Sequence, residues 1–285
     1  MTSENNTLRV AIAQPYTRLG DVEGNLAQVK ELATEAAANG CELILFPEVA
    51  LHGYSVPPEV LEKAVVADGE VAEKLVAHSD REKIIMATGV FERDPEEDVV
   101  YISQFITFPE GRLLVQRKHG GHEKPGIAKA PLDPKIFEVN GVKCCVTICI
   151  DTRIKGIENM LVDLGCQLQL APTAGGGAYP ILHQKDLDDP EKAKKYVEAM
   201  EDSCFPKELA LVKRYRLRMA LATANLATGF DGADYVQQGH SMLMDSTGGL
   251  LALIPGTYIQ EHFRPRVAWG DIHPQQPRRL PESKE

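Results

Sequence analysis

Three side chains suited to acyl chemistry stand at the ends of apolar stretches: Glu48 follows ELILFP, Lys118 follows LLVQR, and Cys149 lies in VTICI. A thiol attacks effectively when a neighbouring base takes its proton and hydrogen-bond donors stabilise the oxyanion that forms. A carboxylate can be that base and an ammonium group that donor. The residue types therefore predict a nucleophilic cysteine, Cys149, assisted by Glu48 and Lys118.

Cys149 is one of three closely spaced cysteines in VKCCVTICI. On a continuous strand Cys145 and Cys149 would share one face and Cys144 would lie on the other. Free cysteines are among the most buried residues, so Cys144 and Cys145 are expected to fill space. Only Cys149 stands at the predicted strand end, where ligands gather in α/β layers, and Asp151 provides a polar setting. We expect a base and a cation beside Cys149 to raise its thiolate fraction above that of the other thiols.

Each of these residues also has an ordinary interpretation. Glu48 could be a helix cap or a solvated acid, and Lys118, beside Arg117, could belong to a solvated face. The coincidence of a carboxylate, an ammonium group and a thiol at three strand ends favours a catalytic site.

The elements that would position them alternate between strands and helices. Residues 8–14 and 41–48 read as strands around a helix that Gly20 and Asp21 open and Asn39-Gly40 closes. One apolar stripe of this helix is made up of Leu26, Val29, Leu32, Ala33 and Ala36. The remaining pattern predicts a helix over 59–78 and strands over 83–91, 99–108, 113–118, 135–139, 142–150 and 166–172, then a helix ending near 219, a strand over 220–227 and a hairpin around 248–249. This alternation predicts a layered α/β domain of about 270 residues.

Composition and charge argue against several classes of protein. The 285 residues carry a formal charge of −10, which argues against a nucleic-acid partner. No apolar run reaches the roughly 20 residues that span a bilayer, and MTSENNTLRV does not resemble a signal peptide, so we expect no membrane association and a cytoplasmic location. Six irregularly spaced cysteines indicate reduced thiols instead of a disulfide framework.

FPEVALHGY around Glu48, QRKH around Lys118 and ICIDTR around Cys149 resemble, in that order, the signature regions of the nitrilase superfamily of carbon-nitrogen hydrolases. RVAIAQ at the start, ATAN at 222–225, GHSMLMDSTGGLLA at 239–252 and VAWGDI before the tail extend the similarity through nearly the whole chain. The resemblance implies a four-layer α-β-β-α sandwich that assembles as a homodimer or larger homo-oligomer through one helical face. We expect no cofactor and no metal.

The resemblance also implies roles. Glu48 would be the general base, Lys118 and the backbone N–H of Ile150 would stabilise the tetrahedral intermediate, and Cys149 would form a thioester with release of ammonia. Tyr54 and Thr173 are predicted to contact the substrate, together with Ile150. The substrate class implied is a small carboxamide or N-carbamoyl compound. Nitrile hydrolysis, acyl transfer to an amine, and a catalytically degraded binding or scaffolding member remain alternatives.

This sequence departs from the amidase pattern after the nucleophile, where Ile150 replaces a tyrosine and IKGIE replaces a Phe-Pro-Glu motif. The family's second glutamate, which orients the lysine, has no obvious counterpart. Between Lys118 and Cys149 the nearby acids are Glu123 and Asp133, and Glu123 is the better candidate.

Four further segments have simple interpretations. HGGHEK at 119–124 is expected to be a loop and not a zinc site, because its histidines lack the HExxH spacing, and AGGGAYP at 174–180 lacks the residues of a phosphate-binding loop. Residues 184–203 read as a charged, exposed helical insertion in the hydrolase domain of residues 1–273, either without function or serving as a lid or oligomer contact. The polar tail of residues 274–285 is expected to be mostly disordered or wrapped on a neighbour.

Overall fold

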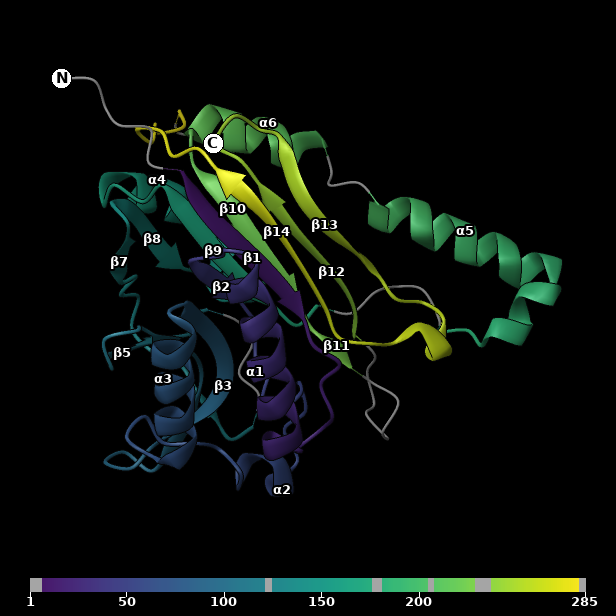
Figure 1. Ribbon diagram of the computed structural model, residues 1–285, viewed down its shortest axis with the longest axis horizontal. Helices are drawn as coiled ribbons and strands as arrows, with labels where there is room; N and C mark the ends of the chain where they lie inside the picture. Colours follow the sequence, from purple (N-terminus) through teal and green to yellow (C-terminus); the bar gives the residue numbers. More distant parts are fainter. Residues whose placement is uncertain (1–6, 121–124, 176–180, 205–207, 229–236, 282–285) are drawn as a thin grey trace.

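The computed structural model describes residues 7–120, 125–175, 181–204, 208–228 and 237–281. In these residues two mixed β-sheets pack face to face, and helices cover the outer face of each sheet (Figure 1). The predicted four-layer α-β-β-α sandwich is confirmed.

The first sheet has the strand order β14-β1-β2-β3-β4-β5, with β6 beside β4. Its central strands β1, β2 and β3 are parallel, and the others join antiparallel except β6. The strands are β1 (Leu8–Gln14), β2 (Leu43–Leu45), β3 (Ile85–Asp94), β4 (Val99–Thr107), β5 (Leu113–Arg117), β6 (Ile127–Ala128) and β14 (Arg266–Ile272).

The second sheet has the order β11-β12-β10-β9-β8-β7, with β13 beside β12. Because β8, β9 and β10 are parallel, their carboxyl ends meet at one edge. The strands are β7 (Ile136–Val139), β8 (Val142–Val146), β9 (Leu168–Thr173), β10 (Ala220–Asn225), β11 (Ala227–Thr228), β12 (Gln237–Met244) and β13 (Leu250–Gly256).

Helices α1 (Val22–Ala38) and α3 (Glu70–Glu82) pack on the outer face of the first sheet, and α4 (Ile157–Asp163) and α6 (Glu208–Leu217) on that of the second. Short α2 (Pro58–Leu61), the 3-10 turns η1 (Cys149–Arg153), η2 (Gln184–Asp188) and η3 (Gln260–His262), and α5 (Pro190–Cys204) complete the described elements.

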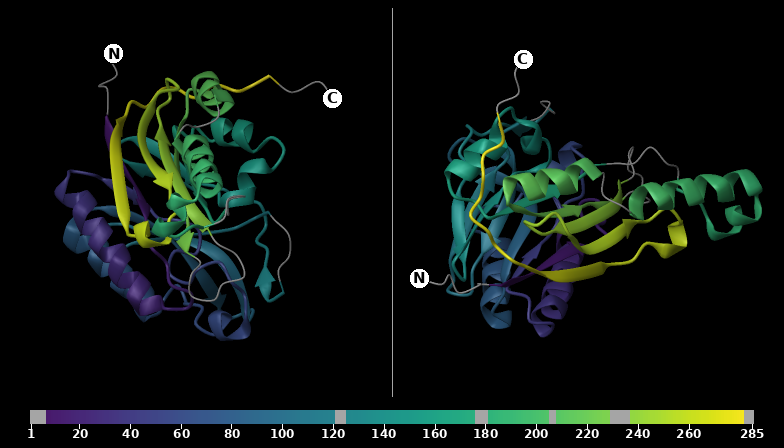
Figure 2. Two further views of the ribbon diagram at one scale, coloured as in Figure 1. Left: turned by 90° about the vertical axis from the view of Figure 1, so that its right-hand side faces the viewer. Right: turned by 90° about the horizontal axis from the view of Figure 1, so that it is seen from above.

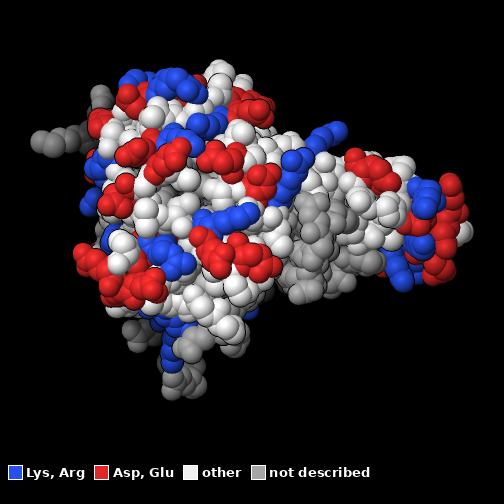
Figure 3. Space-filling model, turned by 90° about the horizontal axis from the view of Figure 1, so that it is seen from below, with Lys and Arg blue, Asp and Glu red and all other residues white. Residues whose placement is uncertain are grey.

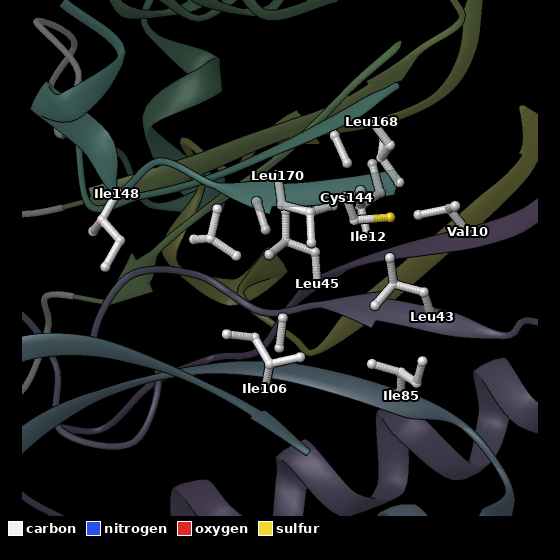
Figure 4. Close-up of a cluster of buried hydrophobic side chains, with 14 of the residues drawn as sticks. Val10, Ile12, Leu43, Leu45, Ile85, Ile106, Cys144, Ile148, Leu168 and Leu170 are labelled. Carbon is white, nitrogen blue, oxygen red and sulfur yellow. The ribbon is translucent and has the colours of Figure 1, made fainter. Parts of the chain in front are cut away.

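The main core lies between the sheets. Ile12 and Leu45 from the first sheet face Cys144 and Leu170 from the second, and all four are fully buried (Figure 4). Burying one such aliphatic side chain contributes about 1.5–3 kcal/mol. Cys145 points the other way, into the cluster beneath α4 and α6, so Cys144 and Cys145 fill space on opposite faces as predicted.

Local sequence explains α1. The Asp21 side chain accepts the Gly24 N–H at 3.1 Å and caps the helix, and Asn39 ends it. The predicted apolar stripe is buried together with Asn25, and its members are Leu26, Val29, Leu32, Ala33 and Ala36.

The helix predicted over 59–78 is wrong in part. Only α2 and α3 are helical, because the segment between them runs along β3: Val65 N–H donates to Phe91 O and Arg93 N–H to Val65 O, both at 2.9 Å. Backbone groups used for this pairing cannot also complete helical turns.

The insertion forms η2 and α5, which confirms its helical and exposed character. Helix α5 extends away from the sandwich beside β13 (Figures 1 and 2). Lys192 pairs with Asp186 at 2.7 Å at its beginning.

The tail, expected to be disordered or on a neighbour, lies on its own chain as far as Pro281. Arg278 N–H donates to Leu217 O at 2.7 Å, and the Asn159 amide pairs with both backbone groups of Leu280 at 2.9 and 3.1 Å. These bonds attach the tail to α4 and to the end of α6.

Acidic and basic side chains are interspersed on the face shown in Figure 3. No helix within the described residues is long and apolar enough to cross a membrane.

Candidate active site

Glu48 lies in the turn directly after β2 and is 1% exposed. This turn packs closely on Gly89 of β3: a Cβ on Gly89 would lie 2.1 Å from the Pro47 carbonyl oxygen and 2.4 Å from the Val49 nitrogen. A residue without a side chain is therefore required at 89 for the backbone around Glu48 to lie where it does.

Lys118 extends β5, since its N–H donates to Ile102 O at 2.8 Å. Its Nζ donates to Glu48 Oε1 at 2.6 Å. Burial acts to lower the pKa of Lys118, but the charge of Glu48 and this hydrogen bond outweigh it, and the pKa is raised. Lys118 is therefore an ammonium ion at neutral pH. The second oxygen, Glu48 Oε2, is buried and has no other donor among the described residues. A hydrogen bond between the Cys149 thiol and the Glu48 carboxylate helps to raise the pKa of that thiol, so an acceptor lies beside the proton that must be removed.

Cys149 is not on β8, which ends at Val146, but opens η1 with a left-handed φ of 51°. The predicted shared face of Cys145 and Cys149 is therefore wrong: the turn directs Cys149 to the cluster between the sheets, whereas Cys145 packs under the outer helices. A non-glycine residue in this conformation costs of order 1–3 kcal/mol, and such strain is often found at functional sites. Cys149 is half-buried, whereas Cys41, Cys144, Cys145 and Cys166 are buried.

Burial, followed by the charge of Glu48, raises the pKa of Cys149 to about 11, although Lys118 and a hydrogen bond from the Ala174 backbone act to lower it. Desolvation and the nearby carboxylate therefore outweigh Lys118 in the resting protein. The thiol is protonated at neutral pH, and its proton must be removed as it attacks.

Burial raises the pKa of Cys145 to about 12 and that of Cys166 well above its usual value, so the expected larger thiolate fraction of Cys149 relative to these two thiols agrees with the structure. The pKa of Cys41 is raised to about 11, as is that of Cys149.

Asp151 connects the turn of Cys149 to the residues after Lys118. Its carboxylate, 1% exposed, accepts the N–H groups of Gly120 at 2.6 Å, His119 at 3.1 Å and Ile148 at 3.1 Å. A Cβ on Gly120 would lie 3.2 Å from Asp151 Oδ1, so glycine allows this close approach. Sequence reasoning gave Asp151 only a polar setting for the thiol and missed this bridge.

The predicted substrate-contacting residues lie around these groups. The Tyr54 ring centroid is 5.9 Å from Lys118 Nζ, and Ile150 follows Cys149 in η1. Thr173 ends β9, and its hydroxyl donates to Asn225 Oδ1 at 3.0 Å. Their roles toward a substrate stay predictions.

The candidate second glutamate, Glu123, lies outside the described residues, as does His122 of the HGGHEK loop. Asp133 is exposed, and its carbonyl oxygen accepts a weak bond from Gln116 Nε2 at 3.4 Å. Across the part of the chain that the structure describes, no group of three His, Cys, Asp or Glu side chains is arranged to hold a metal ion.

The sequence model of the carbon-nitrogen hydrolase family matches residues 9–257. The chain belongs to this family. The matched segment contains Glu48, Lys118 and Cys149, and the predicted membership of the nitrilase superfamily is confirmed.

Solved structures of the superfamily share the fold. A CN-hydrolase superfamily protein from Xanthomonas campestris, with an arsenic adduct in its active site, has a TM-score of 0.71 at 20% identity and covers 94% of this chain and 91% of its own. A mutant of an amidase from Nesterenkonia has a TM-score of 0.71 at 18% identity, with 93% and 91% covered.

The similar curated proteins include different activities. A glutamine-dependent NAD(+) synthetase of Thermotoga maritima is 26% identical over 253 residues, which are 86% of this chain but 39% of the synthetase. A Pseudomonas protegens hydrolase is 29% identical over 172 residues, 59% of this chain and 60% of that protein. An aliphatic nitrilase of Rhodococcus rhodochrous is 26% identical over 132 residues, 41% of this chain. The chain thus spans less than two thirds of the length of these relatives.

Proposed function

We propose that this carbon-nitrogen hydrolase cleaves the C–N bond of a small carboxamide or N-carbamoyl compound, with Cys149 as nucleophile and ammonia as product. The observation that carries the proposal is the 2.6 Å pair of Glu48 and Lys118 beside the half-buried thiol of Cys149. A carboxylate, a cation and a thiol in one site are the three groups that acyl transfer through a thioester requires.

In the proposed first half-reaction, Glu48 Oε2 takes the thiol proton as the Cys149 sulfur forms a bond with the substrate carbon. Lys118 and the N–H of Ile150 stabilise the oxyanion. The C–N bond then breaks, Glu48 returns the proton to the leaving nitrogen, and ammonia departs from the thioester. General acid–base assistance of this kind contributes about 10²- to 10⁴-fold in rate.

In the second half-reaction water attacks the thioester. Glu48 takes a proton from this water, the C–S bond breaks, Glu48 returns the proton to the leaving sulfur, and the acid product is released from the restored thiol. The same oxyanion donors serve both steps, and a donor of this type contributes about 10²- to 10³-fold.

Amides are favoured over nitriles because Asp151 and Arg153 after the nucleophile resemble the amidase and carbamoylase branches, whereas nitrilases commonly have a Trp-Glu pair there. The structural relatives support this choice, since they include Nesterenkonia amidase variants in complex with butyramide and with acrylamide. Nitrile hydrolysis is the second candidate, supported by the aliphatic nitrilase and arylacetonitrilase among the sequence relatives.

Ammonia release tests the proposal. Wild type and Cys149→Ala are assayed side by side with butyramide, glutamine, ureido acids and small nitriles. We expect ammonia from at least one amide or ureido acid with wild type and none with Cys149→Ala. Ammonia from nitriles alone would select the second candidate, and equal release by both proteins would reject Cys149 as the nucleophile.

A degraded binding or scaffolding member would give no ammonia from any compound while remaining folded. Acyl transfer would be revealed by an amide product that accumulates when an amine such as hydroxylamine is added. These outcomes separate the alternatives with the same set of proteins.

We also propose that the protein forms a homo-oligomer through the outer layer of α4 and α6. Met160, Leu164, Val212 and Tyr215 are exposed apolar side chains on this layer, with Tyr215 65% exposed. A second copy is the proposed partner, because the superfamily resemblance implies assembly through one helical face.

A further inference from the structure

Three chain segments meet at the edge where the parallel strands β8, β9 and β10 end. Cys149 follows β8, Ala174 follows β9, and Asn225 is the last residue of β10, directly opposite Thr173 in the register. The carboxyl edge of the second sheet therefore brings an asparagine close to the backbone that borders the thiol.

Ala174 lies beside Cys149, because η1, which Cys149 opens, contacts β9, which Ala174 follows. A hydrogen bond from the Ala174 backbone lowers the pKa of this thiol, and the donor is the N–H, because a carbonyl acceptor would favour the protonated form. Ala174 is 7% exposed and belongs to the core cluster between the sheets, against which Cys149 packs.

One side chain holds the residues on both sides of Ala174. Asn225 Oδ1 accepts the Thr173 hydroxyl at 3.0 Å and the Gly175 N–H at 2.9 Å, and Nδ2 donates to Gly175 O at 3.0 Å. Nδ2 also donates to the carbonyl oxygen of Gly239 at the start of β12, which anchors the amide to the neighbouring strand.

We propose that Asn225 is a positioning residue of the proposed active site, whose amide holds residues 173 and 175 so that the Ala174 N–H points at the Cys149 sulfur. The inference rests on the proposed function, since it concerns the same thiol. It adds an uncharged donor to the groups that face Cys149, which are otherwise the carboxylate of Glu48, the ammonium of Lys118 and the phenol of Tyr54.

An uncharged donor has a specific use here. It stabilises the thiolate that forms during attack without competing with Glu48 for the proton, and it needs no reorganisation because the sheet edge fixes it. Because a backbone N–H cannot be removed by changing its own side chain, Asn225 is the residue through which this donor can be perturbed.

The test is the pH dependence of Cys149 alkylation by iodoacetamide, followed by mass spectrometry of the Cys149 peptide. For Asn225→Ala we expect the midpoint to move to higher pH and alkylation at about pH 8 to slow by about three- to tenfold, since the thiolate loses part of a charge-assisted hydrogen bond. Thr173→Val, which removes one contact of the Asn225 amide with little change in volume, is expected to shift the profile less in the same direction.

Asn159→Ala is the matched control, because the Asn159 amide also pairs with both backbone groups of one residue, Leu280, but on the α4 side of the fold. Its alkylation profile is expected to equal that of wild type. An unchanged profile in folded Asn225→Ala, or equal slowing in Asn159→Ala, overturns the inference. If Asn225→Ala does not fold, the Thr173→Val profile decides.

Alkylation requires no substrate, so the two proposals can fail separately. A shifted profile for Asn225→Ala together with no ammonia release by wild type would reject the proposed function and keep the positioning role. Ammonia release by wild type together with an unshifted alkylation profile for Asn225→Ala would support the proposed function and reject the positioning role.

Discussion

The Asp151 carboxylate accepts the Gly120 N–H at 2.6 Å, and this bond ties the turn that carries Cys149 to the segment that begins with Lys118. The cation and the thiol come from different sheets, so their relative position depends on contacts of this kind. A displacement of about 1 Å can cost on the order of 10²-fold in rate.

For Asp151→Asn we expect a kcat about 10- to 100-fold below that of wild type, because the amide NH₂ would face backbone N–H groups in place of an acceptor. Thermal unfolding should show a loss of about 1–3 kcal/mol from the unsatisfied donors. Asp245→Asn is the control: Asp245, 4% exposed, accepts the His273 N–H at 3.0 Å beside the β12–β13 hairpin. It should lose stability but keep kcat, and a wild-type kcat in folded Asp151→Asn would refute the bridging role.

For Glu48→Gln we expect amide turnover and thiol alkylation to change in opposite directions. The charge of Glu48 helps to raise the pKa of Cys149 to about 11, so its removal lowers this pKa. For each pH unit by which the pKa falls, alkylation below pH 9 becomes about tenfold faster, because the thiolate fraction rises by that factor. Turnover should fall by about 10²- to 10⁴-fold because the base is lost.

For Lys118→Met we expect alkylation of Cys149 to change in the opposite direction. Removal of the cation raises the pKa of the thiol further and therefore slows alkylation. The measurement is the iodoacetamide rate from about pH 7 to pH 11, beside ammonia release. If alkylation slows in Glu48→Gln as well, the charge of Glu48 does not set the ionisation of Cys149.

For Gly89→Ala we expect a fall in thermal stability together with at least a tenfold fall in kcat. The added Cβ would lie 2.1 Å from the Pro47 carbonyl oxygen, so the backbone that carries Glu48 must move away from β3. Gly249→Ala is a suitable control, since the one neighbour near its Cβ among the described residues is Thr247 Oγ1 at 3.7 Å. Full activity in Gly89→Ala would show that Glu48 does not depend on this close approach.

For the oligomer, Val212→Glu on α6 is compared with Val197→Glu on α5, because both side chains are 51% exposed. A charge at 212 within an apolar interface should lower the mass measured by light scattering, whereas a charge at 197 should leave it unchanged. A lower mass for Val197→Glu alone would place the contact between copies on α5. A monomeric wild type would exclude an interface on either helix.

The sequence by itself determined those features that depend on short-range pattern. The cap at Asp21, the buried stripe of α1, the space-filling roles of Cys144 and Cys145, and the placement of Glu48 and Lys118 at strand ends follow from periodicity and turn residues. The three signature regions also led to the family, because their order along the chain is itself sequence information.

The tertiary structure alone decided how these residues meet. Glu48 and Lys118 are 70 residues apart, and β14 pairs with β1 so that Ile272 lies opposite Leu8. The early end of β8 at Val146 turned Cys149 away from the face of Cys145, and burial together with the charge of Glu48 raised the pKa of its thiol despite Lys118. Local patterns determine which conformation a segment prefers, whereas contacts and desolvation depend on the segments that fold against it.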